Sequence, residues 1–337
     1  MKIRHIFFAL APLLVLLVSL EGAFRIYYSL EDTRQARGRS FSTSIGWETD
    51  PNVQALYRRP GNAGVSHYST QAHGFRVFGD PHSRLKKVLV LGDSFTEAKY
   101  IGDGLAYYDF LRKNNPGIEI FAYGSAGFGS MQEYMILDRY FDLIQPDLVL
   151  WQFSGNDIIN NDHELESLSL INNNHMTRPY DEDGTVRMRY PEQIPPWMYG
   201  LMNRSYLIRF LKVKMGFLKS KMSSSTIEKS ISEKDPRFQR SIETTVRILK
   251  KVKARTAGKP VVTFNSNQGN YIHDPVFEDI AGKAGVYFVP GVDEAVHRAR
   301  KQGMRTVVSE ADDHWTEAGH AVAGRRILQV LEEKNLV

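Results

Sequence analysis

Short apolar runs of strand length alternate with longer stretches of helical pattern over most of this chain. The first run, Val88–Leu91, is a short β-branched stretch that ends in Gly92, as in a strand that is buried on both faces of a parallel sheet. The expected strands are Val88–Leu91, Ile118–Tyr123, Asp147–Phe153, Pro260–Phe264 and Val286–Val289, and the expected helices are Leu105–Lys113, Met131–Phe141, Asp235–Arg255 and Glu317–Lys334. This alternation predicts an α/β protein in which a parallel sheet with right-handed crossovers carries helices on both faces.

Two segments interrupt the alternation. Residues 31–84 are polar and rich in Gly, Ser and Arg, which predicts a stalk followed by an irregular lead-in. Residues 158–234 contain clustered asparagines, a charged turn and several prolines, and we expect them to form a lid-like insertion. The chain is therefore divided into an N-terminal segment, residues 1–30, the stalk and lead-in, and one domain, residues 85–337, that contains the insertion.

The N-terminal segment has the form of an export signal. Lys2 and Arg4 precede the uncharged apolar run Ile6–Leu20, which is short for a spanning helix because a bilayer needs about 20 apolar residues. No good small-residue cleavage site follows. An uncleaved single-pass anchor is the first prediction, a cleaved signal peptide the second and a buried core helix the third. The basic residues before the run favour a cytoplasmic N-terminus and an extracytoplasmic remainder.

The composition excludes several classes of protein. The chain has no cysteine, which excludes a disulfide framework, a thiolate zinc site and a cysteine nucleophile. Its formal charge of +5 is spread along most of the chain, so nucleic acid is not an expected partner. A local excess of Lys and Arg among apolar residues at 203–221 is compatible with a face toward anionic lipid or with a solvated face, and both interpretations stay open.

Polar motifs follow three of the expected strands, at the edge where ligands bind in open α/β sheets. The motif GDSFT contains Ser94, the motif GSAG contains Gly127, and the motif SGND contains Asn156. A fourth motif, DDHW, comes before the closing helix and contains Asp312 and His314.

These residue types fit nucleophilic catalysis. A serine hydroxyl becomes a nucleophile when a base takes its proton, and His314 is the candidate base for Ser94. Asp312 is the candidate acceptor that orients the imidazole. The backbone amides of Ser94 and Gly127 and the side-chain amide of Asn156 are the candidate donors to a developing oxyanion. Gly127 suits this role because the lack of a Cβ lets the backbone approach the substrate closely.

In this order the four motifs resemble those of the SGNH (GDSL-like) hydrolases, over roughly residues 68–330, and HGFR at 73–76 resembles the lead-in of membrane-anchored bacterial members. The resemblance implies a flavodoxin-like three-layer α/β/α sandwich and no cofactor. It implies an esterase, lipase or deacetylase, or less commonly an acyltransferase, that acts on an acylated small molecule, glycan or lipid. For an anchored bacterial member it implies a periplasmic domain on the inner membrane, or a secreted protein if the segment is cleaved. The sequence does not indicate an oligomeric state.

The DDHW motif departs from the common pattern of the family. The usual aspartate three residues before the histidine is Ala311 here, which leaves Asp312 two residues before it. That spacing resembles the Asp-x-His-Trp version of periplasmic polysaccharide O-acetyltransferases. Asp313 is adjacent to the histidine and stays an alternative acid of the triad. The first glycine of the third motif is Ser154 in this chain.

Other interpretations of these motifs were weighed. Each motif alone is compatible with ordinary structure, such as a helix cap at GDS, an Asx turn at SGND and a loop with Thr316 as the helix N-cap. A metal site from His314, His320, Asp312 and Asp313 is disfavoured, because the histidines lack the i, i+4 spacing that places two ligands on one helix face. Acyl transfer to a cell-envelope polysaccharide and a non-catalytic protein that binds glycan or a partner are the alternative functions.

Overall fold

A six-stranded sheet, in the order β12-β11-β8-β6-β7-β5, forms the centre of the computed structural model. The strands are β5 Val77–Phe78, β6 Lys86–Gly92, β7 Ile118–Gly124, β8 Leu148–Phe153, β11 Val261–Asn265 and β12 Tyr287–Val289. The structure describes residues 11–26, 39–58, 64–169, 177–190, 227–267, 274–309 and 312–337, and isolated positions between 197 and 218.

All neighbouring strands from β7 to β12 are parallel, and β5 is an antiparallel edge strand on β7. The order β7-β6-β8-β11-β12 is that of a flavodoxin-like doubly wound sheet, in which the connections change direction between the first and third strands. In such a sheet ligands bind at the carboxyl ends of those two strands, which here are β6 and β8. The predicted α/β/α fold class is confirmed.

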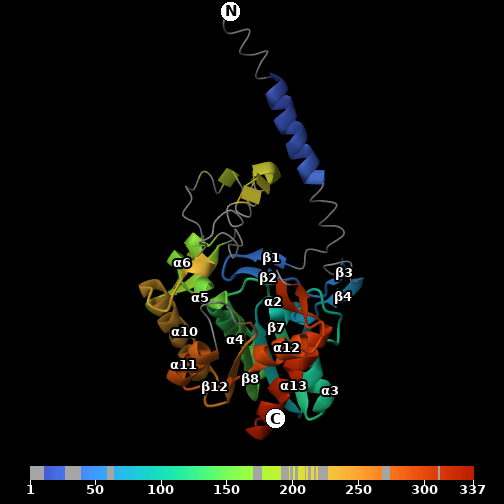
Figure 1. The fold of residues 1–337 in the computed structure, drawn as a ribbon, viewed down its shortest axis with the longest axis vertical. Coiled ribbons are helices and arrows are strands. Elements are labelled where there is room, and N and C mark those ends of the chain that lie inside the picture. The colour runs from blue at the N-terminus through green and yellow to red at the C-terminus, as the bar shows by residue number, and fades with distance from the viewer. Residues whose placement is uncertain are drawn as a thin grey trace, which may run out of the picture.

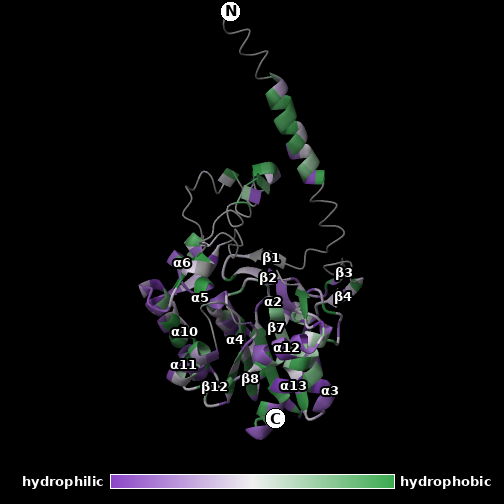
Figure 2. Ribbon diagram, viewed as in Figure 1, coloured by the Kyte–Doolittle hydropathy of each residue, from purple (hydrophilic) through white to green (hydrophobic). Residues whose placement is uncertain are grey.

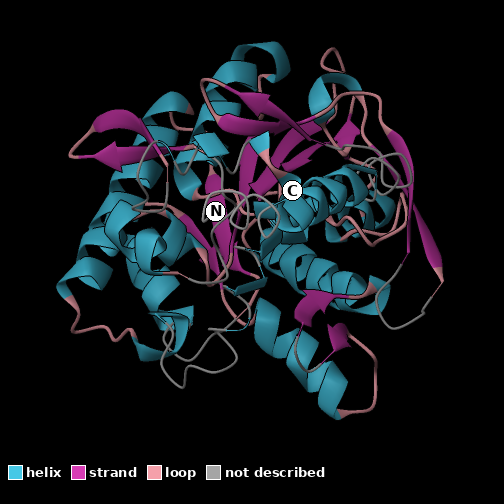
Figure 3. Ribbon diagram, turned by 90° about the horizontal axis from the view of Figure 1, so that it is seen from above, coloured by secondary structure: helices cyan, strands magenta, loops and turns pink. Residues whose placement is uncertain are grey.

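Helices lie on both faces of the sheet (Figure 3). The first face carries α4 Ser130–Ile144, α10 Pro236–Arg255 and α11 Asp274–Ala284, and the second carries α3 Tyr107–Asn114, α12 Val292–Lys301 and α13 Glu317–Glu333. Side chains alternate between these layers along each strand: Leu89 and Leu91 of β6 pack on the first face, and Val88 and Val90 on the second. The uninterrupted apolar run of β6 therefore serves two cores.

Residues 39–84 contain more regular structure than the expected stalk and irregular lead-in. They form the hairpins β1 Arg39–Ser42 with β2 Gly46–Thr49 and β3 Gln54–Arg58 with β4 Val65–Ser69, followed by the 3₁₀ turn η2 Ala72–Gly74 and by β5. Trp47 and Phe75 are fully buried in the core of the domain. Strands of four or five residues give too short a pattern for a periodicity argument, because few alternations fit within them.

The described part of the insertion also has regular structure. It comprises α5 Asp157–Asn160, α6 His163–Leu168, the hairpin of β9 Arg178–Glu182 and β10 Thr185–Arg189, and α9 Ile227–Ser230. Strand β9 packs against α4, α10 and β2, so this hairpin extends the side of the domain that α10 covers (Figure 1).

Residues 11–26 are helical and extend away from the domain, whereas the C-terminus lies at its opposite end (Figure 1). The predicted apolar run Ile6–Leu20 begins in residues 1–10, which lie outside the described part of the chain. Among the residues that are described, no helix has both the length and the apolar character needed to cross a membrane.

Candidate active site

Ser94 is the first residue of the short helix α2, Ser94–Glu97, which begins directly after β6. The Asp93 side chain caps this helix by accepting a hydrogen bond from the Phe95 amide at 3.0 Å. The capping role considered for the GDS motif is therefore real, and it leaves the serine free for another role, because Asp93 and not Ser94 is the cap. The turn places the Ser94 hydroxyl at the carboxyl edge of the sheet.

His314 and Asp312 lie in strand β14, Asp312–Trp315, which pairs with β13, Val307–Ser309. The distance from Ser94 Oγ to His314 Nε2 is 2.7 Å, and the distance from His314 Nδ1 to Asp312 Oδ1 is also 2.7 Å. The sequence interpretation placed the DDHW motif in a loop, but the motif forms strand β14. Asp313 is exposed, and Asp312 makes the contact with the imidazole.

Two aromatic side chains fix the imidazole of His314. The Phe95 ring stacks on it with 4.8 Å between ring centroids, and Phe95 meets Trp315 edge to face at 5.1 Å. The phenylalanine next to Ser94 therefore also supports the base. The side chain of His314 keeps 45% of its exposure, so the imidazole can exchange protons with solvent or substrate.

The charge of Asp312 changes the proton affinity of His314. Burial would lower the pKa of His314, but the hydrogen bond to Asp312 and the negative charge of that carboxylate raise it above the usual value. In return, the hydrogen bond from His314 lowers the pKa of Asp312. The pair therefore favours an ionised acid and a more basic imidazole, as a general base requires.

The three expected oxyanion donors line the same cavity, which has a volume of about 470 Å³. Gly127 has φ = +77°, a conformation that glycine adopts without the strain of a Cβ. The amides of Ser94 and Gly127 make no hydrogen bond to any described residue. The cavity is lined by Ser94, Phe95, Glu97, Ala98, Lys99, Tyr100, Ile101, Ala126, Gly127, Asn156, Val308, Asp312, His314, Trp315 and His320. No described residue of the insertion lines it, so the described part of the insertion does not form the expected lid.

The loop that carries Gly127 is held by two charged residues that the sequence analysis did not single out. The buried Glu97 accepts a hydrogen bond from the Ala126 amide at 2.9 Å. Arg178, which is 1% exposed, donates to the Gly127 carbonyl at 2.7 Å and pairs with the buried Glu166 at 3.1 Å. These two bonds hold the peptides on either side of the one that carries the Gly127 N–H, and so they restrict the orientation of this donor.

A buried polar network holds the first and third motifs together. Gln152 Oε1 accepts hydrogen bonds from the Asp93 amide at 3.1 Å and from Thr96 Oγ1 at 3.0 Å. Ser154 Oγ lies 2.7 Å from Asp93 Oδ2 and also contacts the side-chain oxygen of Asn156. The NH2 group of Asn156 is therefore left for the cavity. Gln152 is a polar residue near the end of the run DLVLWQF, where the other residues after Asp147 are apolar, and this is the signal by which the network could have been anticipated.

His320, one residue of the disfavoured metal site, has its ring engaged by Tyr107. Burial lowers the pKa of His320 to about 3, and its ring stacks on Tyr107 with Nδ1 accepting from the Tyr107 amide at 3.3 Å. Within the described part of the chain, no group of three or more His, Cys, Asp or Glu side chains is arranged to hold a metal ion.

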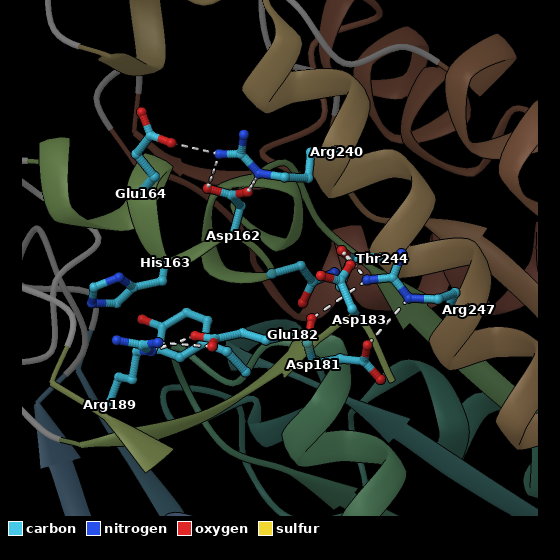
Figure 4. A pocket seen from close by; sticks show the side chains of 12 residues that line it. Asp162, His163, Glu164, Asp181, Glu182, Asp183, Arg189, Arg240, Thr244 and Arg247 are labelled. Atoms are coloured by element: carbon cyan, nitrogen blue, oxygen red, sulfur yellow. Dashed lines mark hydrogen bonds and ion pairs between the residues drawn. The ribbon is translucent and has the colours of Figure 1, made fainter. Parts of the chain in front are cut away.

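A second pocket of about 370 Å³ lies between α6, the β9–β10 hairpin and α10 (Figure 4). Arg240 pairs with Asp162 at 2.7 Å, Arg247 pairs with Asp181 at 3.2 Å, and Arg189 pairs with Glu182. Two residues with hydroxyl groups line the pocket, and both are engaged: Thr244 accepts a hydrogen bond from Arg247 at 2.9 Å, and Tyr180 donates one to Glu166 at 2.8 Å. The described residues that line this pocket include no serine–histidine pair, so the cavity at Ser94 is the candidate active site.

The chain is similar to known proteins in structure and not in sequence. No family model and no curated protein matches the chain. Similar solved structures include a lipolytic protein of the G-D-S-L family from Veillonella parvula, with 11% identity, a TM-score of 0.42, and coverage of 73% of this chain and 98% of the other.

Two further structures give similar values. A lipase/acylhydrolase from Enterococcus faecalis has 10% identity and a TM-score of 0.41, over 74% of this chain and 97% of the other. A catalytic mutant of an acetylxylan esterase from Geobacillus stearothermophilus has 14% identity and a TM-score of 0.41, over 72% and 93%. At these values the similarity does not establish what this chain does, and the function is argued from its own site.

Proposed function

We propose that this protein is a serine ester hydrolase that cleaves an O-linked acyl group through an acyl-enzyme on Ser94. The observation that carries the proposal is the chain of two 2.7 Å contacts from Ser94 Oγ through His314 to Asp312, inside a cavity that Gly127 and Asn156 also line. Nucleophile, base and orienting acid within hydrogen-bond distance of one another form the arrangement that activates a serine.

The first half of the reaction transfers the acyl group to the enzyme. Ser94 Oγ attacks the ester carbonyl carbon while its proton passes to His314 Nε2, and Asp312 stabilises the resulting imidazolium. The carbonyl oxygen becomes an oxyanion that accepts hydrogen bonds from the amides of Ser94 and Gly127 and from the side chain of Asn156. The C–O bond to the alcohol then breaks, and His314 returns the proton to the leaving oxygen.

The second half releases the acid. His314 takes a proton from a water molecule, whose oxygen attacks the acyl carbon and forms a second tetrahedral oxyanion at the same donors. The bond to Ser94 Oγ breaks, His314 reprotonates the serine, and the carboxylic acid leaves. Every step uses only side chains and amides of this chain together with water.

Intact-mass analysis after exposure to a fluorophosphonate tests the proposal. We expect one adduct on the parent protein and none on Ser94→Ala. Ser125→Ala is the matched control: Ser125 also follows a sheet strand, but it is buried and should label like the parent. An adduct that persists in Ser94→Ala would place the activated nucleophile elsewhere, and a folded parent that forms no adduct would favour the alternative of a non-catalytic binding protein.

Acyl transfer to a cell-envelope polysaccharide is a second candidate. It is favoured by the spacing of the triad acid, because Asp312 reaches His314 from two residues before it, as the Asp-x-His-Trp resemblance implies. In that reaction a glycan hydroxyl replaces water as the acceptor from the acyl-enzyme. Assays with a labelled acyl donor distinguish the two: a transferase yields labelled glycan, whereas a hydrolase yields the free acid with or without glycan.

We also propose that the N-terminal segment attaches the protein to the bacterial inner membrane, with the domain on the periplasmic side. Lys2 and Arg4 before the apolar run favour this orientation. In the described helix, the side chains of Leu13, Leu14, Val15, Leu16, Leu17 and Val18 are exposed. Carbonate extraction of cell membranes tests the attachment: an anchored protein stays in the pellet, and a cleaved one is released with a shortened N-terminus.

A further inference from the structure

Helix 11–26 contacts residues 204–210, which lie far along the chain. These residues belong to a second apolar segment, residues 197–218. Oxygens of the Glu21 carboxylate accept hydrogen bonds from Ser205 Oγ at 2.8 Å and from the amides of Tyr206 and Leu207 at 3.2 and 3.0 Å. These amides belong to the first turn of a helical stretch, whose N–H groups have no partner within the helix. A carboxylate from another helix therefore caps this turn, and the two segments are joined by directional bonds.

Two further contacts strengthen this junction. Phe24 packs against Phe210 with 4.5 Å between ring centroids. Arg25 donates a hydrogen bond to the Arg204 carbonyl at 2.6 Å. The second segment is therefore held beside the apolar N-terminal helix, and the two lie at the same end of the molecule (Figure 1).

The second segment exposes large apolar side chains. Every described position from 206 to 218 is helical. Leu211, Met215 and Leu218 have the spacing i, i+4, i+7, which is the spacing of residues that share a helix face, and they are 48%, 55% and 58% exposed. Trp197 and Leu201, in the preceding part of the segment, are also exposed. We call these five residues the apolar stripe.

Cationic side chains accompany the apolar stripe. Arg204 and Lys214 are both exposed, and Lys214 Nζ lies 5.6 Å from the centroid of the Phe210 ring. Helical segments that expose tryptophan and leucine side chains, with Lys or Arg beside them, have the composition of segments that lie in the interface of a bilayer with anionic lipids. An exposed apolar surface of this kind also needs a cover, because soluble proteins rarely leave contiguous apolar residues in water.

We propose that the apolar stripe is a second membrane contact, which lies in the headgroup region of an anionic bilayer beside the N-terminal anchor. The contacts of this segment with helix 11–26, and the basic residues Arg204 and Lys214 beside the stripe, favour lipid over a protein partner. Figure 2 shows the apolar character of both segments, and Figure 1 shows that α2, which begins with Ser94, lies in the half of the domain nearest to them. Two contacts instead of one would limit rotation about the anchor and keep the Ser94 cavity near the membrane surface. The inference rests on the proposed membrane attachment and not on the proposed chemistry.

Trp197 is a natural probe for this contact. The chain has four tryptophans, of which Trp47, Trp151 and Trp315 are at most 2% exposed, whereas Trp197 is 66% exposed. The full chain is reconstituted into vesicles of phosphatidylcholine and phosphatidylglycerol that carry brominated acyl chains. Subtracting the emission of Trp197→Phe from that of the parent isolates the Trp197 signal. We expect a blue shift, and stronger quenching by bromine near the headgroup end of the chains than by bromine near their ends.

A pair of matched variants tests whether the stripe is responsible. Leu211→Asp should lose most of the Trp197 quenching, because it places a charge in the contact. Leu143→Asp should keep it, because Leu143 is similarly exposed at 47% but lies on α4, outside the stripe. Equal quenching in the two variants would contradict a role for the stripe.

The remaining outcomes separate the proposals. A chain that sediments with vesicles while Trp197 stays unquenched and emits as in water would overturn the second contact and leave the anchor. A blue-shifted but unquenched Trp197 would indicate a protein cover, such as a second copy of this chain, and would also overturn it. A chain that does not bind vesicles would overturn both membrane proposals. Fluorophosphonate labelling of Ser94 tests the proposed chemistry, and its result does not depend on any of these three outcomes with vesicles.

Discussion

The cavity at Ser94 and the pocket at Asp181 have similar volumes, about 470 and 370 Å³, but their polar groups are used differently. In the cavity, the amides of Ser94 and Gly127 have no acceptor among the described residues, and the serine hydroxyl is in contact with a titratable base. In the pocket, Asp162, Asp181 and Glu182 are each paired with a cation. Groups that neighbours already satisfy hold structure together, whereas unsatisfied donors beside an activated hydroxyl are available to a substrate.

The largest effect is expected from removing the nucleophile. Ser94→Ala should lower kcat for a p-nitrophenyl ester by about 10⁴-fold or more, because the remaining donors cannot replace covalent catalysis. Thr244→Ala removes a hydroxyl from the other pocket and should leave kcat unchanged. Steady-state kinetics of the parent, Ser94→Ala and Thr244→Ala measure these changes in kcat. If Thr244→Ala lost as much activity as Ser94→Ala, the assignment of the two pockets would be reversed.

The next largest effect is expected from removing the negative charge of Asp312, which contacts the imidazole of His314. Asp312→Asn should lower kcat by about 10²- to 10⁴-fold, because His314 loses the negative charge that holds it in the correct tautomer and stabilises its cation. Asp312 raises the pKa of His314, and the base acts only when it is neutral, so activity of the parent falls as pH drops through that raised pKa. In Asp312→Asn the acid limb of the kcat/KM profile should therefore move to lower pH.

Asp313→Asn is the matched control for this prediction. Asp313 is exposed and adds only a weak charge effect on His314, so its removal should change kcat little and move the acid limb less than Asp312→Asn does. A larger loss in Asp313→Asn than in Asp312→Asn would show that Asp313 is the acid of the triad.

A smaller kinetic effect is expected at the oxyanion donors. Asn156→Ala should lower kcat by about 10²-fold with less change in KM, because the hydrogen bond is strongest to the charge of the transition state. Asn114→Ala makes the same substitution at an exposed position of α3 and should behave like the parent. An Asn156→Ala variant that changes only KM would mean that this side chain binds the ground state and not the oxyanion.

The smallest effect is expected in the other pocket, and on stability instead of rate. The Asp181 side chain is fully buried between Arg247 and Lys251, which are themselves about a third exposed. Asp181→Asn should therefore lower the free energy of unfolding by about 1–2 kcal/mol, below the value for a wholly buried pair because solvent screens the cations. Urea unfolding measures the loss, and ester hydrolysis should be unchanged.

The same variant gives a pH test. Burial opposes ionisation of Asp181, but hydrogen bonds from Lys251, Gly184 and Arg247 lower its pKa below the usual value. Its contribution to stability is therefore present above the unfolded-state pKa and is lost as pH falls through the lower folded-state pKa. The difference between parent and Asp181→Asn should disappear in acid. Asp183→Asn, at an exposed position of the same turn, should match the parent at every pH; a difference that persists in acid would mean that Asp181 acts by packing.

The central sheet could be predicted from the sequence because its signal is local. The run Val88–Leu91 is apolar throughout, Ile118–Tyr123 is interrupted only by Glu119, and the corresponding strands are buried on both faces. The hairpins of residues 39–69 were not predicted, because their burial depends on single aromatic side chains such as Trp47 and not on a repeating pattern. Helices α11 and α12 were not anticipated either, although the strand between them was.

The site, like the fold, contains residues that a local sequence pattern predicts and residues that no local pattern predicts. Ser94, Gly127 and Asn156 were expected together because parallel strands end at one edge of a sheet. Arg178 was not expected near them, because it lies 51 residues from Gly127 in a segment without periodic pattern, and only the folded chain brings its guanidinium to the Gly127 carbonyl. No local feature marks a residue for a contact of this kind.

The sequence by itself determined the five parallel strands of the central sheet and the chemical types of the site, since these depend on neighbouring residues and on periodicity. The choice between Asp312 and Asp313 depended on the tertiary structure. Residues two apart in a strand point to the same side, and residues next to each other point to opposite sides. Because the DDHW motif forms strand β14 and not a loop, Asp312 lies on the side of His314 and contacts its imidazole, while Asp313 is exposed.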